Sequence, residues 1–329
     1  MLKFAFCCLL LGAVCLGAAR PAVAQLTDAE RQTLQENLQA RQLNRDTSRR
    51  AYGALGVLGI SLVPNETAST LSISTGNSDR TGFAATQFGG AFTVSESFPL
   101  YLEGFLGASR YDPSFILSEG QVSRRLPLKW TSFGGTIGVG WDFNITDDLV
   151  LRPIINGSYG HVESDISVAS RILAARTNLD LDFIDGGKLN AYGYGGSLML
   201  DYAHYVEDYE IDAELRYTHI HLKSFDSSFT DFSASSDAQT IALWSRLRVP
   251  TGLHLFDRPF RVVGELSASG LLGDQQIAIG SKYLVQLGAG VEFDIGAISW
   301  LPGQRIRLMG RYVYGKNVSG VSTGIGYSF

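Results

Sequence analysis

The chain contains 329 residues, of which 45% are hydrophobic and 18% are charged, and its formal net charge at pH 7 is −5. The charged fraction lies below the ~25% of ordinary globular domains. Glycine and aromatic residues are abundant, with 37 Gly, 18 Phe and 14 Tyr. No run of about 20 apolar residues follows the first 24 residues, which excludes a helical membrane protein. No basic patch is present that would serve a nucleic acid.

Residues 1–24 are expected to be a removable export signal. Lys3 precedes an apolar stretch over residues 4–17, and the small residues Ala22 and Ala24 fit the cleavage rule. All three cysteines lie inside this signal: Cys7, Cys8 and Cys15. The mature chain is therefore expected to have no disulfide, no thiolate metal site and no cofactor bound through cysteine.

Residues 25–64 are expected to form a leader with two parts. Residues 26–50 are strongly polar, and Thr27 with Glu30 makes a capping box, which predicts a helix starting there. A helix this polar either lies in water or occupies a wet cavity as a plug. Residues 51–63 are apolar and rich in glycine, and their pattern does not decide between helix and strand.

After Pro64 the pattern changes to long segments in which apolar and polar residues alternate, the signature of strands with two different faces. Residues 283–295 show it most clearly, with Leu287 and Val291 on one face and Gln286 and Glu292 on the other. About twelve such segments are predicted, near residues 67–75, 83–95, 99–110, 128–142, 148–161, 189–204, 209–223, 238–249, 259–270, 281–295, 304–314 and 317–329.

These segments favour a membrane barrel over a soluble sandwich, because they approach the 9 to 11 residues that cross a bilayer at a tilt. Aromatic residues mark the ends of the apolar face, as an interfacial girdle requires: Trp141, Tyr192, Tyr194, Tyr202, Tyr209, Tyr312 and Tyr314. The connections alternate between long ones (111–127, 162–188, 224–237) and short ones (96–98, 143–147, 205–208). Residues 65–329 are therefore predicted to be an all-β transmembrane antiparallel barrel of about twelve strands, preceded by an N-terminal α-helix.

The C-terminal segment is similar to the sorting signal that the barrel assembly machinery reads in Gram-negative outer-membrane proteins. Its spacing of polar, glycine and aromatic residues rests on Ser322, Gly324, Tyr327 and Phe329. Together with the helix and the strand count, it resembles the translocator domain of autotransporters. The 40 residues before the barrel are too few for a folded passenger, so the closest family is the solitary autotransporter-like barrel.

This resemblance implies a location and a set of partners. We expect a monomer in the bacterial outer membrane, in contact with outer-membrane lipids. Its partners during insertion would be the barrel assembly machinery and periplasmic chaperones. The expected activity is that of a pore or gated channel for small polar solutes.

Charged residues recur on the predicted lumen face of neighbouring strands. The predicted ladder consists of Arg261, Glu265, Glu292, Asp294, Arg305, Arg307 and Arg311, together with Glu210, Asp212, Glu214, Arg246 and Arg248. Opposite charges on adjacent strands stabilise a sheet and keep a lumen solvated, which is the interpretation we favour. The same ladder is also able to form a selectivity filter or a ligand site.

An enzyme or a surface-binding barrel is the alternative. His219 and His221 lie on the same side of one predicted strand near its outer end, where such a pair is able to bind a metal or act as a base. No third ligand or acidic partner is evident from the sequence, so neither a catalytic nor a metal site is predicted. A lipid or peptide hydrolase would use His219 or His221, and a surface-binding barrel would use the connection 162–188.

Overall fold

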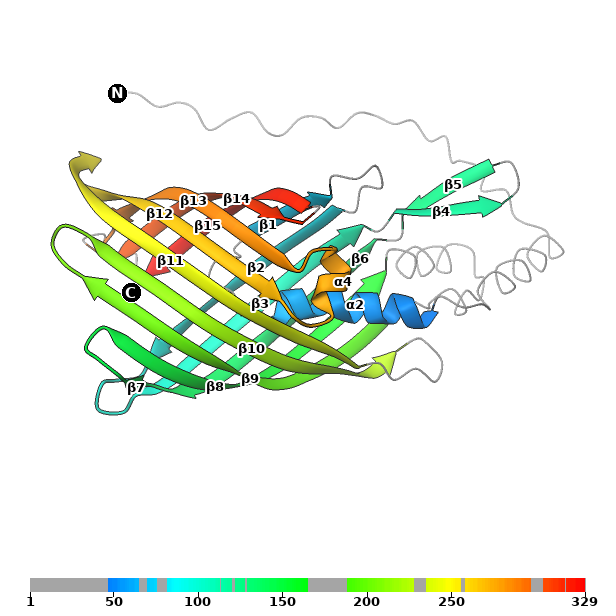
Figure 1. Cartoon of the computed structure of the whole chain (residues 1–329), viewed down its shortest axis with the longest axis horizontal. Helices are drawn as coiled ribbons and strands as arrows, with labels where there is room; N and C mark the ends of the chain where they lie inside the picture. The colour runs from blue at the N-terminus through cyan, green and yellow to red at the C-terminus, as the bar shows by residue number, and fades with distance from the viewer. Residues whose placement is uncertain are drawn as a thin grey trace, which may run out of the picture. The chain divides into compact units, whose positions relative to one another are not determined.

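The computed structural model describes residues 47–64, 70–75, 82–112, 114–119, 122–127, 129–164, 188–227, 235–255, 258–296, 304–316 and 318–328. In this described part the chain forms a closed ring of twelve antiparallel strands around one long helix (Figure 1). The predicted all-β barrel with an N-terminal helix is therefore confirmed. The export signal and most of the polar segment 26–50 lie outside the described residues.

The strands of the ring follow one another in chain order. They are β1 (Thr70–Thr75), β2 (Gly82–Thr93), β3 (Leu100–Asp112), β6 (Trp130–Trp141), β8 (Leu149–Ser164), β9 (Lys188–Tyr205), β10 (Glu210–Ser227), β11 (Ser235–Leu255), β12 (Arg258–Leu271), β13 (Tyr283–Asp294), β14 (Arg305–Gly315) and β15 (Val318–Ser328). The ring closes where β1 pairs with β15, Thr70 opposite Thr323. Closure leaves the ring without the free edges of an open sheet, which a lipid-exposed sheet does not tolerate.

The two ends of the barrel differ in their connections. Residues 113–129, 165–187 and 228–234 leave from one end, here named the long-connection end, and the first of these contains a hairpin of β4 (Ser114–Glu119) and β5 (Val122–Pro127). Residues 94–99, 142–148 and 206–209 lie at the other end, here named the short-turn end. The turn at 142–148 includes the two-residue strand β7 (Phe143–Asn144). This asymmetry matches the predicted one.

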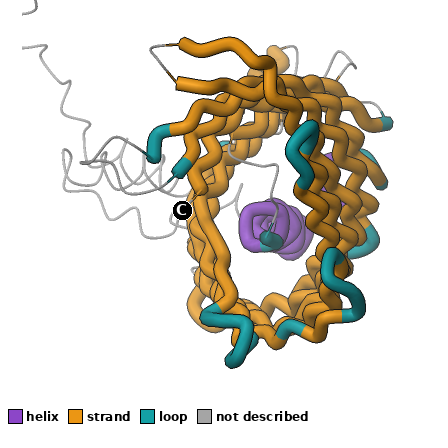
Figure 2. Tube along the Cα trace, turned by 90° about the vertical axis from the view of Figure 1, so that its left-hand side faces the viewer, coloured by secondary structure: helices purple, strands orange, loops and turns teal. Residues whose placement is uncertain are grey.

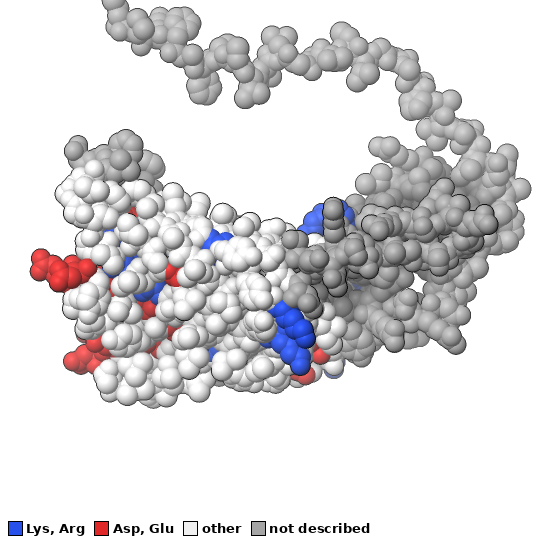
Figure 3. All heavy atoms as spheres, turned by 45° about the horizontal axis from the view of Figure 1, so that its top comes forward, with Lys and Arg blue, Asp and Glu red and all other residues white. Residues whose placement is uncertain are grey.

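The outer face of the barrel is apolar and the inner face is not. Leu287 on β13 is 67% exposed, whereas its neighbour Gln286 and the nearby Glu292 are buried in the lumen. Ile155 on β8 is 77% exposed in the same way. Six of the seven predicted girdle aromatics are exposed on this face, and Tyr202 is partly buried. Figure 3 shows an outer face that is predominantly uncharged, with acidic side chains projecting at one end.

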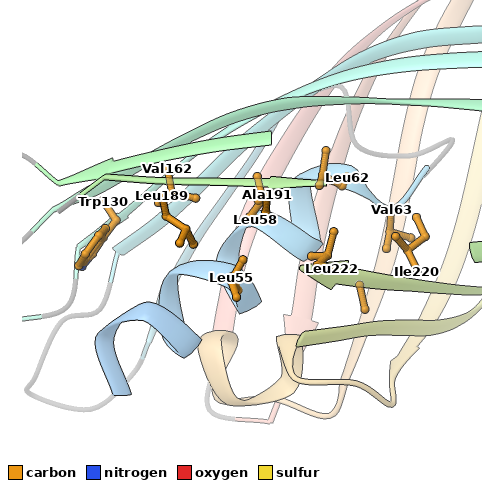
Figure 4. Close-up of a cluster of buried hydrophobic side chains, with 11 residues drawn as sticks. Leu55, Leu58, Leu62, Val63, Trp130, Val162, Leu189, Ala191, Ile220 and Leu222 are labelled. Atoms are coloured by element: carbon orange, nitrogen blue, oxygen red, sulfur yellow. The ribbon is translucent and has the colours of Figure 1, made fainter. Parts of the chain in front are cut away.

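The long helix α2 (Thr47–Leu62) lies inside the ring of strands (Figure 2). Leu55, Leu58 and Leu62 are fully buried against apolar side chains of β6, β8, β9, β10 and β11 (Figure 4). On another side of the helix, Val57 packs against a second apolar cluster that includes residues of β1, β2, β13 and β15. The lumen around the helix is therefore lined mainly by apolar side chains.

This arrangement adds two findings about the lumen. The lumen is not polar over its whole length, because the half near the long-connection end is an apolar core. The helix in the lumen is formed by residues 47–62, mostly the apolar segment that the sequence pattern left unassigned. A helix that is apolar on all sides shows no one-sided periodicity, and such a helix belongs in a buried position.

A second, short helix completes this core. Helix α4 (Gln275–Ile279) lies in the connection between β12 and β13, and its residues Gln275 and Ile279 are buried. Ile279 packs into the same apolar cluster as Val57 of α2. No helix of the described chain combines the length and apolar character needed to cross a bilayer.

The packing of α2 predicts a measurable loss of stability on truncation. Leu58→Ala should lower the free energy of unfolding by about 2–5 kcal/mol, because it leaves a cavity in a closed core. Leu287→Ala, on the lipid-facing side, should have a much smaller effect. Denaturant titration of the chain folded in micelles, followed by gel mobility with and without heating, would measure both. Equal losses for the two variants would contradict the assignment of α2 to a core.

Candidate functional site

Three glycines of the barrel wall form the groove in which α2 lies. They are Gly107 on β3, Gly134 on β6 and Gly160 on β8. A Cβ at Gly107 would lie 2.1 Å from the backbone carbonyl oxygen of Ser61, a distance that no side chain tolerates. Cβ atoms at the other two positions would lie within 3 Å of the side chains of Leu62 and Leu58. The wall is therefore shaped to this helix by the absence of side chains.

The C-terminal end of α2 is also fixed by hydrogen bonds from the wall. Gln87 donates through Nε2 to the carbonyl oxygens of Ser61 (3.3 Å) and Val63 (3.0 Å). Thr136 donates through Oγ1 to the carbonyl oxygen of Leu62 at 2.6 Å. The last carbonyls of a helix have no partner within the helix, so these two side chains supply what the helix lacks. The helix has one defined position in the lumen.

A small cavity of about 60 Å³ remains between α2, α4 and the wall. Gln275 of α4 lines this cavity, and its Nε2 is buried without a hydrogen-bond partner. A volume of this size holds a few water molecules.

Next along the lumen, a buried ion pair joins two strands of the ring that are not neighbours. Arg216 on β10 donates two hydrogen bonds to Glu103 on β3, with Nη1 at 2.9 Å from Oε2 and Nη2 at 2.7 Å from Oε1. The side chains of Glu103 and Arg216 are 0% and 4% exposed. Asn156 and Ser197, on the strands between them, donate to Glu103 and accept from Arg216 respectively. Because β6, β8 and β9 lie between β3 and β10 in the ring, this pair spans the lumen in front of those three strands, and it is named the strut here.

A second buried pair lies along the opposite wall. Arg311 on β14 donates through Nε to Glu265 on β12 at 2.6 Å, and both side chains are at most 5% exposed. Gly288 on β13 lies between them and leaves them room, since a Cβ there would lie 2.8 Å from the Arg311 side chain. Both charged residues belong to the predicted ladder, which the structure brings together here.

The other members of the predicted ladder gather at the short-turn end. Glu210 accepts from Arg305 at 2.7 Å, across the lumen from β14 to β10. Asp212 accepts from both Arg246 and Arg248, at 3.0 and 2.9 Å. The further ladder residues of this group are Arg261, Glu292 and Arg307, which share ion pairs with it, and Asp294, which stands opposite Arg305 in the register. Glu214 lies on the same lumen face of β10, two residues beyond Asp212.

The turn region at this end holds one more charged group. Arg152 on β8 donates to Asp142 and to Asp201, and its guanidinium lies 4.0 Å from the ring centroid of Tyr101. Burial alone would raise the pKa of Asp142, but hydrogen bonds from Arg152 and Thr93 hold it below its ordinary value. The stabilisation by this carboxylate is therefore present at neutral pH and is lost as the pH falls through that lowered pKa.

The strut and the Arg152 group were not predicted from the sequence. A signal for the strut was available, because Glu103 is the only charged residue between Leu100 and Ser109 of an otherwise apolar strand. An ionisable residue in a membrane segment is expensive and faces the interior with a partner. The partner itself is 113 positions away, so the sequence alone could not name it.

The histidine pair lies outside the lumen. His219 and His221 are 43% and 33% exposed on the outer face, and both contact one carboxylate oxygen of Asp237 on β11, at 3.0 and 2.9 Å. This carboxylate is the acidic partner that the sequence could not place. Among the described residues no cluster of three or more His, Cys, Asp or Glu side chains is arranged to hold a metal ion.

The terminal signature falls on the last strand. Ser322 and Gly324 point into the lumen, whereas Val321 and Ile325 are exposed on the outer face at 60% and 69%. Tyr327 pairs with Ile306 of β14 in the register. Phe329 lies outside the described residues, so its role in assembly stays a prediction.

Comparisons with known proteins describe what the chain is similar to. No protein-family model and no curated protein matches it. Three solved structures of autotransporters are similar in fold. The β domain of Bordetella BrkA is 15% identical over 79% of this chain and 98% of its own, with a TM-score of 0.43.

The other two similar structures are also translocation units. The transport unit of Escherichia coli AIDA-I is 14% identical over 87% of this chain and 100% of its own, with a TM-score of 0.46. The translocator domain of Neisseria meningitidis NalP is 13% identical over 79% of this chain and 86% of its own, with a TM-score of 0.40. At this level of similarity, what the chain does has to be inferred from its own geometry.

The strut between Glu103 and Arg216 gives a stability prediction. Arg216→Met should cost about 3–5 kcal/mol of unfolding free energy, because it leaves the Glu103 carboxylate buried without its cation. Adding Glu103→Gln should recover part of that loss. Asp148→Asn, which breaks an exposed pair with His204, should cost about 1 kcal/mol or less. A double-mutant cycle in denaturant would measure these values, and additive losses would show that the two side chains do not act as a pair.

Proposed function

We propose that the chain is an outer-membrane barrel that encloses a gated conduit for small polar solutes, held shut by its own helix α2. The observation that carries this proposal is the docking of α2 in the lumen by the wall glycines and by hydrogen bonds from Gln87 and Thr136. The long-connection end faces the cell exterior in this proposal, because long outer loops and short inner turns are the usual arrangement.

The charged half of the lumen supports a conduit over a purely structural barrel. Buried ion pairs are weak contributors to stability, and well-packed apolar side chains of similar volume often serve at least as well. Here the short-turn half is nevertheless lined by charged side chains, some of them partly exposed, such as Arg305 at 24% and Asp201 at 36%. Such a lining keeps water and polar solutes in the lumen.

The closed state has two seals in series. The first is the apolar core formed by α2 and α4, and the second is the strut of Glu103 and Arg216. A solute passes only when both are displaced. The first seal rests on apolar contacts and on side-chain hydrogen bonds between α2 and the wall, whereas the second rests on one buried ion pair.

The first test adds one methyl group to the barrel wall, at a point where it would collide with α2. Gly107→Ala places a Cβ against the backbone of Ser61, so α2 should leave its groove and channel openings in planar bilayers should become frequent. Gly104→Ala is the matched control, because it lies on the same strand and nothing is within 4 Å of its Cβ. Identical traces for the two variants, with both barrels folded by heat-modifiability, would contradict the proposal.

A reversible lock keeps the test independent of folding defects. A Cβ at Gly59 would lie 3.1 Å from Cβ of Ala238, so a shift of about 0.4 Å would bring the pair into the range of about 3.5–4.5 Å that disulfides occupy. The oxidised Gly59→Cys, Ala238→Cys variant should stay closed, and a reductant should restore whatever openings the parent chain shows. Openings that persist in the oxidised variant would mean that solutes do not pass where α2 lies.

The second seal predicts a stepwise gain of conductance. Deleting residues 47–62 should leave a narrow opening, because Glu103 and Arg216 still bridge the lumen. Adding Glu103→Gln and Arg216→Gln to that deletion should enlarge the single-channel conductance further, since neutral side chains no longer hold the two walls together. A full-sized conductance from the deletion alone would show that the strut does not obstruct the lumen.

A further inference from the structure

At the short-turn end of the lumen, arginines of three strands lie against carboxylates of two others. Five arginines from β11, β12 and β14 surround carboxylates of β10 and β13. This arginine cluster consists of Arg246, Arg248, Arg261, Arg305 and Arg307. The carboxylates are Glu210, Asp212 and Glu292, with Asp294 opposite Arg305 in the register. Within this group five guanidinium groups share four carboxylates.

Arg261 is the member of the arginine cluster that lacks a direct partner. Its shortest contacts with carboxylate oxygens are 3.6 Å to Glu292 and 3.7 Å to Glu210, both too long for a hydrogen bond. The other four arginines each have a carboxylate oxygen within 3.0 Å. Nη1 of Arg261 and Nε of Arg248 are buried without a hydrogen-bond partner. Buried N–H donors of this kind call for an acceptor.

Two arginines of the cluster are more exposed than the carboxylates that they face. Arg261 and Arg305 are 20% and 24% exposed, whereas Glu292 is fully buried and Glu210 is 13% exposed. Oε1 of Glu292 also lacks a hydrogen-bond partner, and it lies 3.6 to 3.9 Å from nitrogen atoms of three guanidinium groups. Arg261 and Arg305 are therefore more accessible than the two carboxylates closest to them.

We propose that the arginine cluster binds a small oxyanion, a carboxylate or a phosphate, with Arg261 as its main ligand and Arg305 beside it. The planar guanidinium matches two oxygens of such an anion, and charge-assisted hydrogen bonds of this type are short and strong. The proposal deepens the proposed conduit by naming anionic solutes as the class it favours, and in that respect it rests on the proposed function. The binding step itself requires only the closed barrel.

Calorimetric titration of the full chain in detergent micelles tests the binding. Sodium phosphate and sodium citrate are the probes, and sodium chloride at matched ionic strength is the reference. Both probes should bind above the chloride background, and Arg261→Gln should weaken binding about tenfold, as expected for the loss of a charged hydrogen-bond donor. Arg261→Lys keeps the charge but loses the planar guanidinium, so its affinity should lie between those of the parent chain and Arg261→Gln.

Arg110→Gln is the matched control, because it removes an exposed guanidinium from the long-connection end of β3 and should leave the affinity unchanged. Heat-modifiability shows that each variant is folded, and Arg261→Lys serves in place of Arg261→Gln if the latter does not fold. No binding above chloride, or equal affinities for the parent and the Arg261 variant, would overturn the proposal. Binding that depends on Arg261 in a chain that never conducts would refute the conduit and leave the oxyanion site standing.

Discussion

In a closed ring of strands whose outer face contacts lipid, polar side chains must point into the lumen. The hydrogen-bond ladder satisfies the backbone, because each strand of the ring pairs with a neighbour on both sides. Side chains alternate between the two faces, so every second residue must be accommodated in the lumen. The contents of the lumen are therefore forced by the chemistry of the surroundings, and the lumen is where this chain differs from a plain barrel.

The alternation that follows from this constraint is visible in the sequence, which is why the barrel could be predicted. The segment predicted at 283–295 is strand Tyr283–Asp294, and Glu292 faces inward as expected. The charges of β10 to β14 share the lumen because they share one phase of the alternation. Strand β11 is longer than predicted, since the register shift between Pro250 and His254 interrupts the pattern where the strand continues.

Two features could not be predicted from the pattern, for different physical reasons. Helix α2 is surrounded by apolar walls, so its residues show neither the period of an amphipathic helix nor that of a strand. The strut of Glu103 and Arg216 joins strands that are not neighbours in the sheet. Register between adjacent strands follows from alternation, but a contact across the lumen depends on how the ring curves, which no pairwise pattern specifies.

The position of α2 beside the first and last strands of the ring has a consequence for how the barrel assembles. The helix precedes the first strand, and its Val57 belongs to an apolar cluster that also includes residues of β1 and β15, the strands that meet to close the ring. A helix that already lies against the early strands therefore offers the late strands an apolar surface on the correct side. Closing the ring then buries this surface, so the segment that seals the finished lumen is also the template on which its last seam forms.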